Sequence, residues 1–248
     1  MTEIVAFDKY NAFGAYHWVE CDQRLVNWRR YNPALDARYL ITVRAVKEIG
    51  LQGSLLDIGC GDGLLMARLA PLVRRAVGVD SDETAIRLAV EKLCAFANCE
   101  IIHGSSYELP FRSDSFDIVV SADVVEHLKH PALHLHEICR VLRPEGALVL
   151  TTPKWRPDRR WDVRHEKEYH ADELRALLAQ YFQDVKLNFF WPKRASHLYE
   201  TKLGWRYLKL LAILFHNSFD RVGSDPEKFG QILAICRNRR QESASESL

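Results

Sequence analysis

The sequence lacks the features that mark secreted, membrane-spanning and disulfide-bonded proteins. Its six cysteines are scattered and form no Cys-x-x-Cys pair, which argues against a structural zinc site and is typical of reduced thiols. The most apolar run, residues 208–215, is far shorter than the roughly 20 residues that a bilayer span needs. No basic start followed by an apolar core is visible at the N-terminus, so we expect no secretory signal and predict a cytoplasmic protein.

Neither sign of charge dominates, because 34 Lys and Arg residues stand against 33 Asp and Glu residues. This balance disfavours a general nucleic-acid binder. With 248 residues, 48% of them hydrophobic, the chain can build one substantial α/β core. We expect a single domain over residues 1–237, with a nucleoside-binding core at 33–182, edge strands and a helical lid insertion at 183–237, and a disordered tail at 238–248.

Short apolar runs alternate with helical patterns along most of the chain. Such alternation predicts a doubly wound, Rossmann-like α/β sheet with right-handed crossovers, preceded by an N-terminal helical segment. A helix at 203–215 and a polar turn separate the last two strands, which allows the final strand to return antiparallel at the sheet edge. The predicted strands are 54–58, 75–80, 99–104, 116–122, 147–153, 185–191 and 229–237.

The sharpest motif is LLDIGCGDGLL at residues 55–65. Gly59, Gly61 and Gly63 follow a predicted strand and open a predicted helix, so the backbone can turn tightly and a ligand can approach the main chain. A plain strand–helix turn usually needs one glycine. Three glycines at alternate positions therefore indicate a ligand-binding loop.

The charges around this loop distinguish two ligand classes. A dinucleotide-binding GxGxxG loop has a third glycine where this chain has Leu64, and Asp57 and Asp62 would repel a pyrophosphate. The same carboxylates would attract the ammonium and sulfonium groups of S-adenosylmethionine. Asp80 ends the second strand and can accept ribose hydroxyls of either nucleoside, since Ser81 is the expected cap of the next helix.

Four segments in order, LLDIGCGDG, AVGVD, LPFRSDSFDIVVSADVVEHLKHP and RVLRPEGALVLTTP, resemble the class I S-adenosylmethionine-dependent methyltransferases. The similarity covers roughly residues 50–182 and is greatest to the branch with ubiquinone-biosynthesis and polysaccharide-associated enzymes. It implies a methyltransferase with a seven-stranded sheet and antiparallel last strand, S-adenosylmethionine as cofactor and S-adenosylhomocysteine as product. The implied cofactor-binding residues are Asp57, Gly59, Cys60 and Gly61 around the methionine moiety, Asp80 on the ribose, Ser105 and Ser106 near the adenine, and Ala122.

Methyl transfer from a cationic sulfur needs orientation and exclusion of water, and neither a nucleophile nor a metal is obligatory. A base helps when the acceptor is a hydroxyl group. Asp123, Glu126 and His127 are spaced so that a helical turn would place them on one face. We predict His127 as the general base, because an imidazole titrates near neutral pH. The alternative is that Glu126 and His127 only cap and solvate the turn.

A metal site is a second interpretation of the same residues. Some related ubiquinone and small-RNA 3′-end methyltransferases carry a Glu-x-x-Glu-His metal motif, and this chain has Asp-x-x-Glu-His. Asp123, Glu126 and His127, joined by His165, could hold Mg²⁺, Mn²⁺ or Zn²⁺. We favour the metal-independent interpretation, because acids on a helix face usually have a simpler explanation.

The loops after the fifth and sixth strands should cover the acceptor. Segments 152–170 and 191–215 hold four of the six tryptophans and many arginines, which could bind a sugar, a phosphorylated group or a ring. The insertion at 198–226 could be a lid, an interface or a membrane contact, and we expect its helix to pack against its own domain. The predicted substrate residues are Trp155, Arg159, Arg160 and His165.

We therefore predict transfer of a methyl group to an oxygen of a hydroxylated small molecule, such as a sugar, a quinone precursor or a phenol. A metal-dependent RNA methyltransferase is the first alternative, and near-zero net charge disfavours it. An NAD-dependent oxidoreductase is disfavoured by Asp62 and Leu64. A non-catalytic relative is a third alternative, and the oligomeric state is left open.

Overall fold

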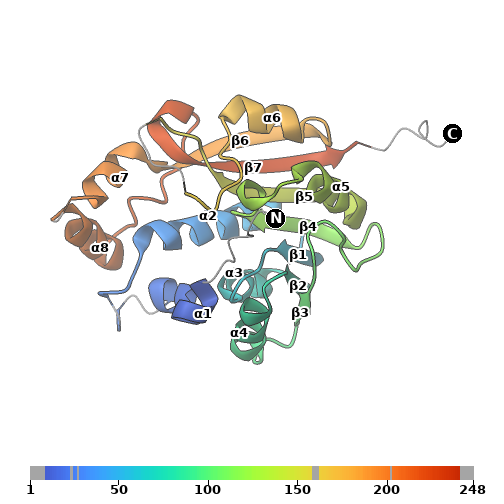
Figure 1. The fold of residues 1–248 in the computed structure, drawn as a ribbon, viewed down its shortest axis with the longest axis horizontal. Coiled ribbons are helices and arrows are strands. Elements are labelled where there is room, and N and C mark those ends of the chain that lie inside the picture. Colours follow the sequence, from blue (N-terminus) through green and yellow to red (C-terminus); the bar gives the residue numbers. More distant parts are fainter. Residues whose placement is uncertain (1–8, 23–24, 27, 158–161, 202, 241–248) are drawn as a thin grey trace.

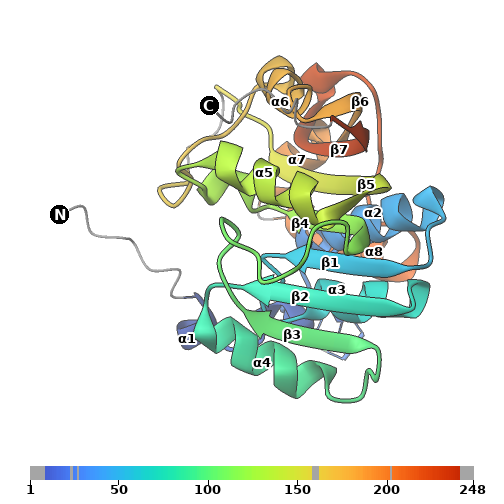
Figure 2. The ribbon, with the colours of Figure 1, turned by 90° about the vertical axis from the view of Figure 1, so that its right-hand side faces the viewer.

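The computed structural model describes residues 9–22, 25–26, 28–157, 162–201 and 203–240, which form a seven-stranded mixed sheet between two layers of helices (Figures 1 and 2). The strand order is β3-β2-β1-β4-β5-β7-β6, and Figure 2 shows the sheet running from β3 to β6. This confirms the predicted fold. The strands are β1 Ser54–Ile58, β2 Arg75–Asp80, β3 Cys99–His103, β4 Phe116–Ala122, β5 Leu142–Pro153, β6 Phe182–Pro192 and β7 Phe229–Arg239.

The last strand is antiparallel as predicted, but it does not lie at the sheet edge. β7 pairs antiparallel with β5 on one side and with β6 on the other. Ile232 and Ala234 are fully buried there, and β6 forms the edge of the sheet instead. Asn238 and Arg239, predicted as part of the tail, extend this strand because Arg239 still pairs with Phe182. Residues 241–248 of the predicted tail lie outside the described residues.

The two faces of the sheet bury different helices because successive strand residues point to opposite faces. In β1, Leu56 contributes to a core with α5 (Pro131–Val141) and α6 (Ala171–Leu178), whereas Leu55 contributes to a core with α2 (Pro33–Ile49), α3 (Leu64–Leu69) and α4 (Glu83–Leu93). β1 pairs parallel with β2 and with β4. The carboxyl ends of these three strands therefore lie at one edge of the sheet, where the loops that follow them meet.

Two helix starts, those of α2 and α4, are capped by side chains. The side chain of Asn32 accepts a hydrogen bond from Leu35 N, and Pro33 occupies the first turn of α2. At α4 the cap is Asp82 rather than the predicted Ser81, because the Asp82 carboxylate reaches the amide of Ala85 at 2.9 Å.

The insertion between β6 and β7 contains α7 (Lys193–Tyr199) and α8 (Gly204–Leu214). The predicted packing of this insertion is present on one face of α8, where Leu208 joins Ala34, Ala37 and Phe219 in a small core. The opposite face of α8 is exposed. Within the part of the chain that the structure describes, no helix is both long and apolar enough to cross a membrane.

A buried polar network joins α2 to α3 beneath the N-terminal segment. The Asp36 carboxylate is 3% exposed and accepts hydrogen bonds from Tyr31 Oη and from an Arg68 guanidinium nitrogen, both at 2.8 Å. Removing one partner from a buried pair leaves the other charge uncompensated, which costs far more than losing an exposed pair.

We expect Asp36→Ala to lower the free energy of unfolding by roughly 3 kcal/mol, because it strands the Arg68 charge in a poorly solvated site. Asp220→Ala is the matched control, since its partner on α2, Arg44, is 55% exposed, and we expect a loss below about 1 kcal/mol. Reversible urea denaturation measures both variants. Equal losses would contradict this account of the network.

Candidate active site

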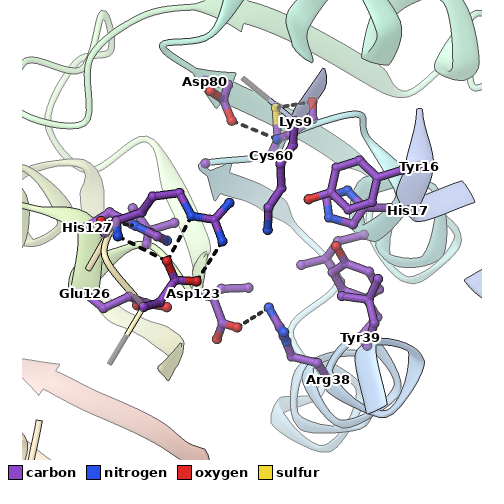
Figure 3. Close-up of a pocket in the computed structure, with 18 of the residues that line it drawn as sticks. Lys9, Tyr16, His17, Arg38, Tyr39, Cys60, Asp80, Asp123, Glu126 and His127 are labelled. Carbon is purple, nitrogen blue, oxygen red and sulfur yellow. Dashed lines mark hydrogen bonds and ion pairs between the residues drawn. The ribbon is translucent and has the colours of Figure 1, made fainter. Parts of the chain in front are cut away.

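A cavity of about 1000 Å³ lies at the carboxyl ends of β1, β2 and β4 (Figure 3). Its walls come from the glycine loop, from the loops after β4 and β5, and from α7. A further wall comes from α1 (Lys9–Phe13), the segment that follows it, and α2. In Figure 3, Tyr16 and His17 face Asp123 and His127 across the cavity. The described N-terminal residues, for which the sequence analysis gave no role, thus form part of the site.

The glycine loop turns sharply because its glycines adopt positive φ angles, 76° at Gly59 and 56° at Gly61. A Cβ atom at Gly59 would lie 2.4 Å from the side chain of Val124, and one at Gly61 would lie 2.2 Å from Tyr10 Oη. Gly61 is therefore required twice over, for its backbone conformation and for the close approach of α1.

Asp80 is bound to the same loop. Its carboxylate accepts hydrogen bonds from the amides of Gly61 and Asp82, both at 2.9 Å, and it lines the cavity. Burial raises the pKa of this carboxyl, although the backbone hydrogen bonds oppose the shift. Each carboxylate oxygen has a further lone pair, so Asp80 can also accept hydroxyl groups of a ribose.

Asp57 is the least satisfied polar group of the cavity wall. It is 1% exposed, and neither carboxylate oxygen has a hydrogen-bond partner among the described residues. Burial, and then the charge of Asp80, raise the pKa of the Asp57 carboxyl well above its ordinary value. A buried carboxyl without a partner is costly, and a cationic ligand would supply the missing partner.

The sequence predicted that the Asp62 carboxylate would attract a cationic ligand. In the structure Asp62 is not part of the cavity wall. Its carboxylate is buried and accepts a hydrogen bond from the amide of His17 at 3.1 Å, and His17 Nδ1 lies 3.0 Å from it. Trp18 Nε1 donates to the Asp62 carbonyl at 2.9 Å. Asp62 thus holds the N-terminal segment over the loop, and the attraction for a cation comes from Asp57 and Asp80.

The other residues predicted to bind the cofactor are divided by the structure. Cys60, Ser106 and Ala122 line the cavity. Ser105 is exposed, and its hydroxyl accepts a hydrogen bond from the amide of Tyr107, so it braces the turn after β3. Of the two serines, Ser106 is the one that lines the cavity.

The turn after β4 is not the helical turn expected from the spacing of its acids. Asp123 has a φ of 56°, and a single 3-10 turn follows at Val125–His127. Asp123 is ion-paired with Arg38 and accepts a hydrogen bond from Thr151 Oγ1 at 2.9 Å. The carboxylate predicted to join Glu126 and His127 is therefore bound to α2 and β5 instead.

His127 lines the cavity with its ring held in one orientation. Its Nδ1 lies 3.0 Å from the carbonyl oxygen of Arg164, so Nδ1 carries the proton and Nε2 is the basic nitrogen of the neutral ring. Burial lowers the pKa of His127, and the hydrogen bond to the carbonyl opposes this shift only in part. The ring is therefore neutral at pH 7, as a general base requires.

Glu126, His127 and His165 form a group that could hold a metal ion, since one ligand atom of each lies within 4.8 Å of the others. Glu126 is buried and accepts a hydrogen bond from Thr152 Oγ1 at 2.9 Å. His165 Nδ1 lies 2.9 Å from Glu168 Oε1. Among the described residues this group does not include Asp123, the acid that the sequence predicted as its first ligand.

The predicted substrate residues have mixed positions. The ring of Trp155 packs on His170 at 4.4 Å between centroids and is not part of the described cavity wall. His165 contacts His127 with ring centroids 4.8 Å apart, behind the cavity wall. Arg159 and Arg160 lie outside the described residues. From the same segment, Arg156 and Arg164 do line the cavity.

Several residues of the cavity wall were not predicted from the sequence. Tyr16 and Tyr39 are distant in sequence, and both bring aromatic rings next to His17, at 3.9 Å and 5.7 Å between centroids. Arg38 lies over the ring of Trp191 at 5.6 Å. The one signal in the sequence was the concentration of aromatic residues in the N-terminal segment. It gave no indication of where that segment would pack.

Comparison with known proteins agrees with this geometry. A family model described as a methyltransferase domain matches residues 56–150. A probable S-adenosylmethionine-dependent methyltransferase of Mycobacterium tuberculosis is 35% identical over 128 residues, which cover 50% of this chain and 46% of that protein. The chain is thus similar to class I S-adenosylmethionine-dependent methyltransferases, as its sequence motifs predict. It spans about half the length of the curated relatives it matches.

Two further matches extend the comparison. A demethylmenaquinone methyltransferase of Staphylococcus aureus is 29% identical over 111 residues, covering 43% of this chain and 46% of that protein. The fold matches phosphoethanolamine N-methyltransferase 2 of Haemonchus contortus, solved with S-adenosyl-L-methionine, at a TM-score of 0.65 and 15% identity, over 96% of this chain and 61% of that one. At such identity the structural match shows the fold alone.

The methyltransferase assignment supports the predicted cofactor, S-adenosylmethionine, and the residues present fit it. The unpartnered carboxyl of Asp57 suits the cationic methionine end, and Asp80 suits the ribose. Gly59 and Gly61 leave the backbone open between the two. These four residues would hold the methyl donor in the cavity.

We expect Asp57→Asn to weaken S-adenosylmethionine binding at least tenfold, a loss of about 1.4 kcal/mol, because the cation loses its charged partner. The same change should raise stability at pH 7 by roughly 1–3 kcal/mol. In the unfolded chain the Asp57 carboxyl ionises near its ordinary pKa, whereas in the folded protein its pKa is raised and it ionises only at higher pH. Between these two pKa values the free energy of unfolding of the wild type therefore falls as the pH rises. The amide of the variant cannot titrate, and the fall should disappear.

Calorimetric titration measures the affinity, and thermal unfolding between pH 4 and pH 8 measures the stability. Asp172→Asn, at an exposed position on α6, is the matched control and should change neither quantity. Unchanged donor affinity in Asp57→Asn would remove this carboxyl from the cofactor site.

Proposed function

We propose that this protein is an enzyme that transfers the methyl group of S-adenosylmethionine to a hydroxyl oxygen of a small molecule. The supporting observation is a single cavity whose wall contains both the glycine loop with Asp80 and the neutral imidazole of His127. A donor held by the loop and an acceptor hydroxyl near His127 would share one enclosed space. Proximity in such a space is the main source of rate acceleration in methyl transfer.

The acceptor class follows from the rest of the wall. Tyr16, Trp191 and Tyr199 offer aromatic surfaces, and Arg156 and Arg164 offer cationic ones. A hydroxylated ring, such as a phenol or a quinone precursor, suits such a mixture better than an aliphatic chain. The relative named demethylmenaquinone methyltransferase supports a ring acceptor. A sugar is the alternative.

The bound donor would supply an electrophilic methyl group on a cationic sulfur. His127 Nε2 would then accept the proton of the acceptor hydroxyl as the oxygen becomes nucleophilic. The Arg164 carbonyl fixes the ring, and the ion pair of the Arg164 guanidinium with Asp162 at 2.7 Å stabilises the local conformation of this loop. The described N-terminal residues form one wall of the cavity, which would limit the access of water to bound substrates.

Two alternative functions considered from the sequence differ in their support. The match of residues 56–150 to a methyltransferase domain disfavours an NAD-dependent oxidoreductase. A metal-dependent methyltransferase acting on RNA is supported by the proximity of Glu126, His127 and His165. The net charge of +1 and the absence of Asp123 from that group disfavour it. We further propose a cytoplasmic location, which the six cysteines, none in a disulfide, support.

We expect methyl transfer from labelled S-adenosylmethionine to at least one member of a panel of phenols, quinone precursors and sugars, measured as S-adenosylhomocysteine release. The rate should be unchanged in EDTA, because the proposed base is an imidazole and not a metal-bound group. Activity lost in EDTA and restored by Mg²⁺, Mn²⁺ or Zn²⁺ would support the metal-dependent alternative. Release with RNA alone would overturn the small-molecule proposal.

We expect His127→Ala to lower kcat about 10²- to 10⁴-fold, the usual contribution of a general base. In the wild type, burial lowers the pKa of His127, so the acidic fall of kcat should lie below pH 6.5. That fall should be absent in His127→Ala. His136→Ala, on the exposed side of α5, is the control and should keep the wild-type profile. A His127→Ala profile identical to the wild type would exclude His127 as the base.

A further inference from the structure

The outward face of α8 is apolar and exposed. Leu203, Tyr207, Leu210 and Leu214 recur at intervals of four, three and four residues, so they lie on one face, and their exposed fractions lie between 56% and 78%. The inward face is filled by other apolar residues, including Leu208. A surface helix of a globular protein normally turns polar residues to the solvent, so this helix has a second apolar face with no partner in the described chain.

A second exposed apolar segment lies against this helix. Lys209 Nζ donates a hydrogen bond to the Arg29 carbonyl at 2.7 Å, which places residues 28–30 beside α8, with Leu25 and Val26 shortly before them in the chain. Figure 1 shows α8 and the chain that leads into α2 at the same end of the molecule. We call the two segments together the apolar patch, and its exposed residues are Leu25, Val26, Trp28, Leu203, Tyr207, Leu210, Leu214 and Phe215.

The charges around the apolar patch are of one predominant sign. Within residues 22–30 and 193–216, the exposed and described side chains include four arginines but only two acids, in a chain whose net charge is +1. An apolar surface with guanidinium groups at its margin complements a surface that is apolar below and anionic above. The residues concerned are Arg29, Arg30, Arg194 and Arg206, with Asp22 and Glu200.

The apolar patch adjoins the cavity. α7 packs against α8, and Ser196 and Tyr199 of α7 line the cavity wall. Phe219 lines the same cavity and belongs to the small core beneath α8. A surface that rested on the apolar patch would therefore lie beside one wall of the cavity.

We propose that α8 and the described residues 25–26 and 28–30 form a docking surface for an anionic lipid bilayer, with the outward face of α8 lying in the interface. The leucines and aromatic residues would enter the boundary between headgroups and acyl chains, and the arginines would contact lipid phosphates. A second copy of the chain fits this surface less well, because a twofold contact would bring the same arginines of both copies together. That the bilayer also delivers a lipid-soluble acceptor to the cavity rests on the proposed function.

The test is co-sedimentation of the full chain, without donor or acceptor, with vesicles of phosphatidylcholine alone and with vesicles containing about 30% phosphatidylglycerol. We expect binding to the anionic vesicles that weakens at least tenfold between about 0.05 M and about 0.5 M NaCl, because salt screens the arginines. The double variant Leu210→Glu/Leu214→Glu should bind at least tenfold more weakly, since it places charge on the outward face of α8. Trp28 and Trp205 fluorescence should shift to shorter wavelength on binding only in the wild type.

The matched control is Val90→Glu/Leu133→Glu, which introduces the same charges at positions of similar exposure on α4 and α5 and should bind like the wild type. Equal donor affinity in both double variants would show that the fold is retained. Wild type that stays in the supernatant, or Leu210→Glu/Leu214→Glu that binds normally, overturns the proposal. The proposal is also overturned if the wild type binds no vesicles but forms a concentration-dependent dimer, and Leu210→Glu/Leu214→Glu abolishes that dimer. None of these readouts needs methyl transfer, so failure of the proposed function would be seen separately.

Discussion

The left-handed backbone of the glycine turn after β1 is the constraint on which the rest of the site depends. Positive φ angles at Gly59 and Gly61 direct the loop back so that Gly61 N reaches the Asp80 carboxylate and Tyr10 can approach the backbone. An L side chain at either position would be strained and would collide with a neighbour. The wall beneath the donor and the N-terminal wall above it are therefore set by the same few residues.

Three carboxylates near this turn have distinct roles because their surroundings differ. Asp80 is satisfied by backbone amides, Asp62 by the N-terminal segment, and Asp57 by nothing in the described chain. These differences in hydrogen-bond partners are not visible in the sequence, where all three residues are simply acids near a glycine loop. A buried acid without a partner lowers stability, which is the usual cost of a prepared ligand site.

Much of the fold was predictable because it depends on local patterns. Each strand contains a short apolar run, and α2 begins after the Asn32 cap and ends before Gly50, as capping rules predict. The place of β7 was not predictable, since insertion between β5 and β6 depends on pairing with residues far away in sequence. The role of Asp62 was missed for the same reason, because its partner His17 lies 45 residues earlier.

The turn after β4 shows a different limit of prediction from the sequence. The spacing of Asp123, Glu126 and His127 is that of a helix face, but the ion pair with Arg38 and the hydrogen bond from Thr151 hold Asp123 in a left-handed conformation. Tertiary contacts therefore override the local pattern. The ring of His127 is oriented as a general base requires, because its Nδ1 is bound to the carbonyl of Arg164. This contact could not be predicted from the sequence.

The N-terminal covering of the cavity has a kinetic consequence. Tyr10 lies against Gly61, and the contacts of His17 and Trp18 with Asp62 keep that covering closed. A donor bound at the glycine turn would lie against this segment. The more firmly these contacts hold, the slower the exchange of one nucleoside for the next would be.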